Sequence, residues 1–243
     1  MGDGKLSQGK LGGRIALITG ASRGIGAAVA KLFAAEGAQV VLVSRSVGGL
    51  EEVDDAIRAT GHPGATLLPL DLADGAKIDQ LGYALAERFG RLDVLVLNAG
   101  MLGGFSPVGH QTPKIFEKLM AVNFAAPWRL IRACDPLLRA SDAGRIIATI
   151  GGPGTATPEH FTGPYAASKA ALLSLMQTYA VENAKTKLRV NCVDPSTVAT
   201  RLRAEGFPGE DASGFTTPDG IAPLYLDLAT VECERNGTVL RLQ

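Results

Sequence analysis

The sequence is poor in cysteine and carries no excess of charge of either sign. Its three cysteines, Cys134, Cys192 and Cys233, lie far apart among 243 residues. This spacing excludes a disulfide framework and a cysteine-based zinc site, and it fits a reducing cytoplasm. The 24 basic and 24 acidic residues cancel, which argues against an overall basic protein that binds nucleic acid or anionic membranes. We therefore expect no metal site, no nucleic-acid partner and no membrane partner.

Long hydrophobic runs are absent as well. No run approaches the roughly 18 residues of a membrane-spanning helix, and the segment from Met1 to Gly13 lacks the apolar core of a secretory signal. Hydrophobic residues nevertheless make up 46% of the chain, which excludes intrinsic disorder. We predict a flexible tail over residues 1–12 and a single domain over residues 13–243, because one α/β domain often reaches about 250 residues.

Short apolar runs alternate with longer stretches of helical periodicity along this domain. The expected strands are Arg14–Thr19, Gln39–Val43, Thr66–Leu70, Leu92–Leu97, Arg145–Ile150, Leu188–Val193 and Thr238–Leu242. The expected helices are Ile25–Glu36, Val47–Thr60, Ala73–Phe89, Pro113–Arg139, Thr162–Ala184 and Pro218–Ala229. This alternation predicts an α/β protein with a doubly wound parallel sheet of about seven strands and helices on both faces, a Rossmann fold. Its ligand crevice lies at the carboxyl ends of the strands.

A glycine-rich loop joins the first expected strand to the first expected helix and reads Thr-Gly-Ala-Ser-Arg-Gly-Ile-Gly over residues 19–26. Gly20 permits a tight turn, Gly24 lets a pyrophosphate approach the backbone, and Gly26 lets the helix pack close to the sheet. The helix N-terminus then offers free N–H groups to phosphate oxygens. The loop predicts a dinucleotide site that includes Ser22, Arg23 and Ile25.

The end of the second expected strand indicates which dinucleotide binds. An NAD site usually places an acid there for the ribose 2′-hydroxyl, but this sequence reads Ser44-Arg45-Ser46. Arg45, together with Arg23 from the glycine loop, suits a 2′-phosphate, so we expect NADP(H) rather than NAD(H). Asp71, which precedes Leu72 after the third strand, either accepts from the adenine amino group or caps the next helix.

Tyr165 and Lys169 lie one helical turn apart on the expected helix Thr162–Ala184. Residues four apart share a helix face, so the phenol and the ammonium can point into the same crevice. A phenol has a pKa near 10, and a nearby ammonium lowers it. Tyr165 can then exchange a proton with a carbonyl or hydroxyl oxygen while a nicotinamide exchanges hydride with the attached carbon.

With these motifs in place, the sequence resembles the short-chain dehydrogenase/reductase family from about Gly13 to Leu242. The resemblance implies that the segment Asn98-Ala99-Gly100 lines the cofactor crevice and that Asn123 holds a water in a proton relay. It also implies that Lys169 bonds the nicotinamide ribose. The segment after the sixth strand would contact the cofactor through Pro195, Val198 and Thr200, although Ser196 replaces the glycine that usually follows the proline.

The sequence departs from the family at one catalytic position. Family members carry a serine 13 residues before the tyrosine, where this chain has Gly152. That serine holds the substrate oxygen, and loss of one such donor costs on the order of 10²–10³ in rate in other enzymes. The candidates to replace it are the side chains of Thr155, Thr157 and His160, or the backbone N–H of Gly151 or Gly152. Without a replacement the protein would be a slow or silent reductase.

These observations favour an NADP(H)-dependent oxidoreductase acting on a small, hydrophobic carbonyl or alcohol. The pocket candidates are Met101, Leu102, Phe105, Phe207 and Phe215. Two alternatives remain open: a cofactor-binding protein with little turnover, acting as a sensor or assembly partner, and an interaction module that uses the fold as a scaffold. The resemblance also implies a homodimer or homotetramer formed through the helices about Thr112–Arg139 and Thr162–Ala184.

Overall fold

The computed structural model describes residues 9–152 and 154–242. Of the tail expected over residues 1–12, residues 1–8 lie outside this part of the chain. Residues 9–12 pack against the first helix, where the Leu11 N–H donates to the Glu36 carbonyl at 2.9 Å. The Leu11 side chain is fully buried.

The core of the fold is one parallel sheet of seven strands in the order β3-β2-β1-β4-β5-β6-β7. The strands are β1 (Ile15–Thr19), β2 (Gln39–Ser44), β3 (Thr66–Pro69), β4 (Val94–Leu97), β5 (Arg145–Thr149), β6 (Arg189–Asp194) and β7 (Val239–Arg241). β1 and β4 are neighbours at the centre of the sheet. From β1 the chain adds strands towards one edge, and from β4 it adds strands towards the other, so the strand order reverses between them. The expected doubly wound sheet is confirmed, and the reversal places a crevice above the carboxyl ends of the central strands.

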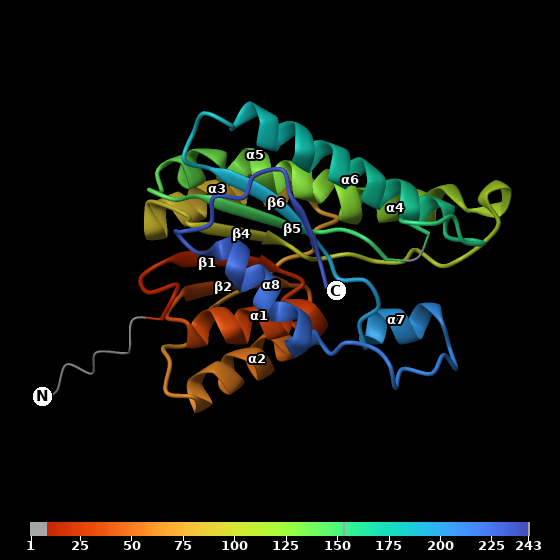
Figure 1. Ribbon diagram of the computed structural model, residues 1–243, viewed down its shortest axis with the longest axis horizontal. Coiled ribbons are helices and arrows are strands. Elements are labelled where there is room, and N and C mark those ends of the chain that lie inside the picture. The colour runs from red at the N-terminus through yellow and green to blue at the C-terminus, as the bar shows by residue number, and fades with distance from the viewer. Residues whose placement is uncertain (1–8, 153, 243) are drawn as a thin grey trace, which may run out of the picture.

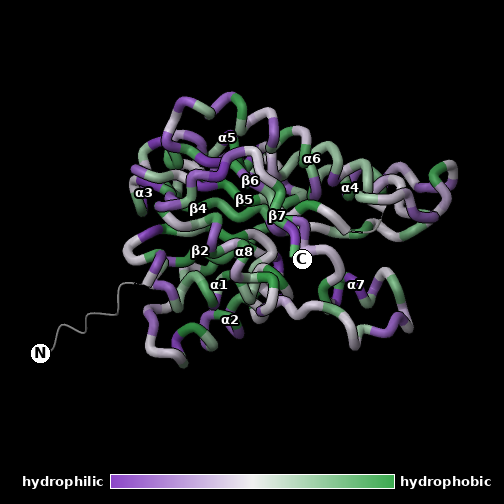
Figure 2. Tube along the Cα trace, in the orientation of Figure 1, coloured by the Kyte–Doolittle hydropathy of each residue, from purple (hydrophilic) through white to green (hydrophobic). Residues whose placement is uncertain are grey.

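Helices cover both faces of the sheet (Figure 1). On one face lie α1 (Gly24–Ala35), α2 (Val47–Ala59) and α8 (Pro218–Ala229). On the other lie α3 (Gly75–Phe89), α4 (Pro113–Met120), α5 (Ala126–Arg139) and α6 (Gly163–Glu182). The strands between them are almost wholly apolar, as a sheet buried on both faces requires, and Figure 2 shows hydrophobic segments along the central strands.

Two elements differ from the sequence-based expectation. The helix expected over Pro113–Arg139 is split by a π-helical turn, Ala121–Ala125, which separates α4 from α5. A short helix, α7 (Arg201–Gly206), forms in the segment after β6, where no helix was expected. The Thr200 side chain caps α7 by accepting from the Arg203 N–H at 3.2 Å. Figure 1 shows α7 beside the carboxyl edge of the sheet, set apart from the two helical layers.

Within residues 9–152 and 154–242, no helix is long and apolar enough to cross a membrane.

Candidate active site

One cavity of about 390 Å³ lies over the carboxyl ends of the central strands. Nearly all the residues expected to bind cofactor or to act in catalysis line it. They are Gly20, Ser22, Arg23, Gly24, Ile25, Arg45, Asp71, Leu72, Asn98, Ala99, Gly100, Tyr165, Lys169, Pro195, Val198 and Thr200. Gly26 and Asn123, the two other expected residues, lie behind the cavity wall and are buried.

The glycine loop between β1 and α1 is closed too tightly for a side chain at Gly26. A Cβ there would lie 2.6 Å from the Asn98 amide nitrogen and would also collide with the Gly20 carbonyl. The N-cap of α1, Arg23, makes no side-chain cap hydrogen bond, and the first turn contains no acidic residue. The N–H groups at this end of the helix are therefore available to an anion.

Positive charge and hydroxyl groups gather at the β2 end of the cavity. Arg23 and Arg45 are both exposed, and neither forms a salt bridge with any residue that the structure describes. The hydroxyl of Ser44 donates to that of Ser22 at 2.8 Å. Ser46 instead caps α2 by accepting from the Gly49 N–H. Two unpaired guanidinium groups beside a helix N-terminus suit a dianionic phosphate.

Asp71 does not cap the following helix. That function belongs to Asp74, whose carboxylate accepts from the Lys77 N–H at 3.2 Å. Asp71 accepts from the Ala73 N–H at 3.0 Å in a local turn and lines the cavity. The capping alternative drawn from the sequence is therefore wrong, and contact of Asp71 with the adenine amino group stays a prediction.

Tyr165 and Lys169 lie on the inner face of α6, and both are buried. The ammonium nitrogen of Lys169 donates to the Thr149 carbonyl at 2.9 Å and lies 6.0 Å from the centre of the Tyr165 ring. Burial lowers the pKa of Lys169 to about 8. Burial, and secondarily the negative charge of Asp194, raises the pKa of the Tyr165 phenol. The lowering of this pKa that was expected from the nearby ammonium is therefore wrong, because burial outweighs it, and the phenol stays protonated at neutral pH, in the form that donates a proton.

Thr149, at the end of β5, bonds side chains from helices on both faces of the sheet, Lys169 of α6 and Tyr225 of α8. This residue was not identified from the sequence. While its carbonyl accepts from Lys169, its hydroxyl contacts the buried Tyr225 hydroxyl of α8 at 2.7 Å. The same hydroxyl donates to the Asn98 side chain at 3.2 Å. Only its position at the end of an expected strand, where the crevice was predicted, could have identified Thr149 as a site residue.

Asn123 lies in the π-helical turn, and its side chain ties two segments together. Its amide nitrogen donates to the Met101 carbonyl at 2.9 Å and to the Ser168 hydroxyl at 3.0 Å. Its amide oxygen accepts from the Met101 N–H at 2.9 Å. Because both amide hydrogens and one lone pair of the amide oxygen are used in these bonds, we expect any contribution of Asn123 to a proton relay to come from its backbone.

The loop between β5 and α6 takes a shape that a side chain at residue 152 would disturb. Gly152 has a φ of +108°, and a Cβ on it would lie 2.7 Å from the Tyr165 hydroxyl. That hydroxyl donates to the Gly151 carbonyl at 3.1 Å. The loop backbone lies directly against the tyrosine hydroxyl and occupies the space beside it.

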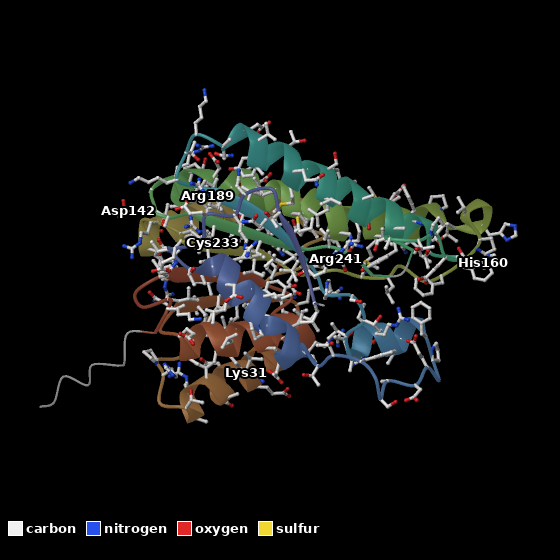
Figure 3. The ribbon with its side chains drawn as sticks, in the orientation of Figure 1. Lys31, Asp142, His160, Arg189, Cys233 and Arg241 are labelled. Carbon is white, nitrogen blue, oxygen red and sulfur yellow. The ribbon has the colours of Figure 1, made fainter. Side chains whose placement is uncertain are left out.

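None of the side chains considered as replacements for the serine reaches Tyr165. The Thr155 hydroxyl donates to the Gly152 carbonyl at 2.7 Å, and Thr157 is exposed. Figure 3 shows His160 at the far tip of its loop, away from the cavity. The N–H groups of Gly151 and Gly152 make no hydrogen bond to any described residue, so the backbone is the remaining donor.

Replacing Gly152 with serine is therefore expected to destabilise the protein by about 1–3 kcal/mol and to leave turnover no higher than that of the wild type. The new Cβ would be strained at a positive φ and would press on Tyr165. Chemical denaturation measures the first effect, and steady-state kinetics the second. Gly104, which also has a positive φ but open space around it, provides the control substitution Gly104→Ser. Increased turnover in Gly152→Ser would show that the loop rearranges to accept a side chain.

The outer part of the cavity is apolar. Met101, Leu102 and Phe207 line it, and the Phe207 ring meets Phe105 edge-on at 5.3 Å between centroids. The guanidinium of Arg203 stacks on Phe207 at 3.7 Å.

Two arginines, Arg201 and Arg203, line the cavity at this end, and each is paired with a glutamate: Arg201 with Glu205 and Arg203 with Glu210. Two hydrogen bonds of 2.6 and 2.5 Å join the Arg203 guanidinium to the Glu210 carboxylate. The pairing lowers the pKa of Glu210, so the pair stays ionised at neutral pH. This end of the cavity therefore presents aromatic and aliphatic surface without a net charge.

This fold and this arrangement of groups define a class of nucleotide-dependent oxidoreductases. The sequence model of the short chain dehydrogenase family matches residues 14–211, and the chain belongs to that family. The resemblance inferred from the motifs is thus confirmed.

Individual relatives are similar over most of their length. The uncharacterized oxidoreductase YciK of Escherichia coli K12 is 39% identical over 218 residues, which cover 89% of this chain and 86% of the relative. An uncharacterized NAD-dependent oxidoreductase of Mycobacterium tuberculosis is 34% identical, covering 91% and 90%. The structure of a short chain dehydrogenase from Escherichia coli CFT073, complexed with NADPH, has a TM-score of 0.91, 36% identity and coverage of 97% and 98%.

Proposed function

We propose that the protein is an NADP(H)-dependent reductase of small hydrophobic carbonyl compounds, with Tyr165 as the proton donor. The observation that carries the proposal is the pair of buried side chains Tyr165 and Lys169 at the wall of a cavity whose far end holds two unpaired arginines. The NADPH complex of a structural relative supports the choice of cofactor, and the NAD-dependent name of another relative is the competing indication.

The glycine loop and the N-terminus of α1 would hold the pyrophosphate, and Arg23 and Arg45 the 2′-phosphate. Asp71 would accept from the adenine amino group. When bound, the cofactor supplies a hydride to the carbonyl carbon.

The chain's own residues supply the proton. Tyr165 donates its hydroxyl proton to the carbonyl oxygen, and the developing phenolate is stabilised by the Lys169 ammonium. Before this, the substrate oxygen has to replace the Gly151 carbonyl as the acceptor of the tyrosine hydrogen bond. A backbone N–H of Gly151 or Gly152 is the donor we assign in place of the serine hydroxyl.

The lining of the outer cavity supports a neutral, hydrophobic substrate. Aromatic and aliphatic side chains stabilise apolar groups that leave water. The arginine closest to them, Arg203, is already paired with Glu210, so a substrate carboxylate would have to displace an existing carboxylate to gain a partner.

A cofactor-binding protein with little turnover is the second candidate. It is favoured by the hydrogen bond from Tyr165 to Gly151, which satisfies the tyrosine within the protein. In either case, the exposed apolar side chains Trp128 on α5 and Val181 on α6 support assembly into a homodimer or homotetramer through these helices.

The test is an NADPH oxidation assay with matched pairs of carbonyl compounds: a neutral aromatic aldehyde and its carboxylate-bearing analogue, and a linear aldehyde and an aldose. We expect the neutral aromatic and linear aldehydes to be reduced with the highest kcat/KM, and NADPH to be preferred over NADH. Titration of each cofactor by fluorescence provides a separate measure of binding. Tight NADPH binding with no carbonyl reduced would support the second candidate, and absence of binding would exclude both.

A further inference from the structure

Asp194, the last residue of β6, is a buried carboxylate that the proposed chemistry does not use. The residue is 8% exposed and lies behind the cavity wall, while the next two residues, Pro195 and Ser196, line the cavity. A buried carboxylate close to a reaction site affects every change of charge there, because the surrounding protein screens it weakly.

Three segments meet at this carboxylate. One oxygen accepts from the Arg241 side chain of β7 at 3.0 Å, and the other accepts from the Ser196 N–H at 3.1 Å. The second bond closes a turn that holds Ser196 at a φ of +55°, a conformation that this side chain-to-backbone bond makes acceptable for serine. A Cβ on Gly151 would lie 2.6 Å from the carboxylate carbon, so Asp194 packs directly on the backbone of the β5–α6 loop.

The same loop residue links Asp194 to Tyr165, because the Gly151 carbonyl accepts from the tyrosine hydroxyl. Within the described residues, Tyr165 lies beside the ammonium of Lys169 on its own helix and is separated from the carboxylate of Asp194 by the backbone of Gly151. Arg241 of β7 forms a salt bridge with Asp194 and so reduces the negative charge that Asp194 presents to Tyr165. The site therefore holds one positive and one negative charge near the phenol, and an arginine that partly neutralises the negative one.

We propose that Asp194 is a positioning residue whose negative charge favours the oxidised, positively charged nicotinamide over the reduced form. This inference rests on the proposed NADP(H) site. A nicotinamide that reacted beside Tyr165 would lie on the same side of the loop as this carboxylate, and only its oxidised form would gain from the negative charge. Arg241, whose side chain is 64% exposed, weakens the effect.

The experiment compares the dissociation constants of NADP⁺ and NADPH, and it requires no substrate. We expect Asp194→Asn to raise the ratio of the NADP⁺ constant to the NADPH constant about fivefold. Arg241→Met is expected to lower the same ratio by about two- to threefold, because it leaves the carboxylate charge unopposed. The control is Glu234→Gln, which removes an exposed charge paired with Arg189 at the opposite end of β6 (Figure 3) and leaves the ratio unchanged.

Opposite shifts in the two variants identify an electrostatic effect, because a merely structural disturbance weakens both forms of the cofactor alike. Arg241→Met alters a mostly exposed side chain and so keeps the test valid if Asp194→Asn folds poorly. An unchanged ratio in both variants, or shifts in the same direction, would overturn the inference while leaving the cofactor site intact. If the wild-type protein binds neither NADP⁺ nor NADPH, the proposed function fails and the inference fails with it.

Discussion

Tyr165→Phe is expected to lower kcat for carbonyl reduction by about 10³-fold and to leave the NADPH dissociation constant within about threefold of the wild-type value. Phenylalanine fills the same volume but has no proton to donate. Among the described residues, the Tyr165 hydroxyl is the only side-chain group that donates a hydrogen bond to the Gly151 carbonyl, so no neighbouring donor replaces it in the variant. The measurement is single-turnover reduction of the best aldehyde, with cofactor binding followed by fluorescence.

Tyr179→Phe is the matched control for this experiment. Tyr179 lies on the same helix, but its hydroxyl bonds Asp135 outside the cavity, so kcat is expected to change by less than about twofold. Equal rates for wild-type protein and Tyr165→Phe would mean that the proton comes from water, and the reductase mechanism proposed here would be wrong.

The double substitution Arg23→Ala with Arg45→Ala is expected to weaken NADPH binding by about 10²-fold, because each charge-assisted hydrogen bond to a phosphate contributes roughly 1.5–3 kcal/mol. NADH lacks the 2′-phosphate, so its dissociation constant is expected to change by less than about threefold. The preference for NADPH should therefore disappear. Titration of the two cofactors into the same protein preparation measures both values.

Lys31→Ala controls for the loss of positive charge. Lys31 lies on α1 with its side chain 45% exposed and pairs only loosely, at 3.9 Å, with Asp219 (Figure 3). Its removal should leave both dissociation constants unchanged. If the double substitution weakens NADH as much as NADPH, the two arginines serve the shared part of the dinucleotide, and the assignment of the 2′-phosphate site is wrong.

The order of the elements was predictable because it depends on patterns that are local in the sequence. Apolar runs such as Leu92–Leu97 have no other stable place than a buried parallel sheet, and the glycine loop at residues 19–26 identifies the first βα turn. Tyr165 and Lys169 were predictable as a pair because helical spacing alone places them on one face. Their burial followed from the fold, which packs the inner face of α6 on the sheet.

The features that escaped prediction depend on contacts between distant segments. The π-helical turn holds Asn123 against Met101 and Ser168, and no local pattern in the sequence indicates an extra residue in a helical turn. Likewise, the proximity of Asp194 to Tyr165 depends on how two loops pack, which residue types and spacing do not specify. The sequence alone predicts Gly152 as a departure from the family at the serine position, and its backbone shape, with a φ of +108°, could not be predicted from the residue type.

The shape of the β5–α6 loop also bears on how this chain could change in evolution. Because the backbone at Gly152 lies against Tyr165 at a φ of +108°, a serine acquired there in one mutational step would press on the tyrosine hydroxyl. Selection for a serine at this position would therefore also require a second change that opens the loop. Single substitutions would instead adapt the site through the positions around its backbone donors.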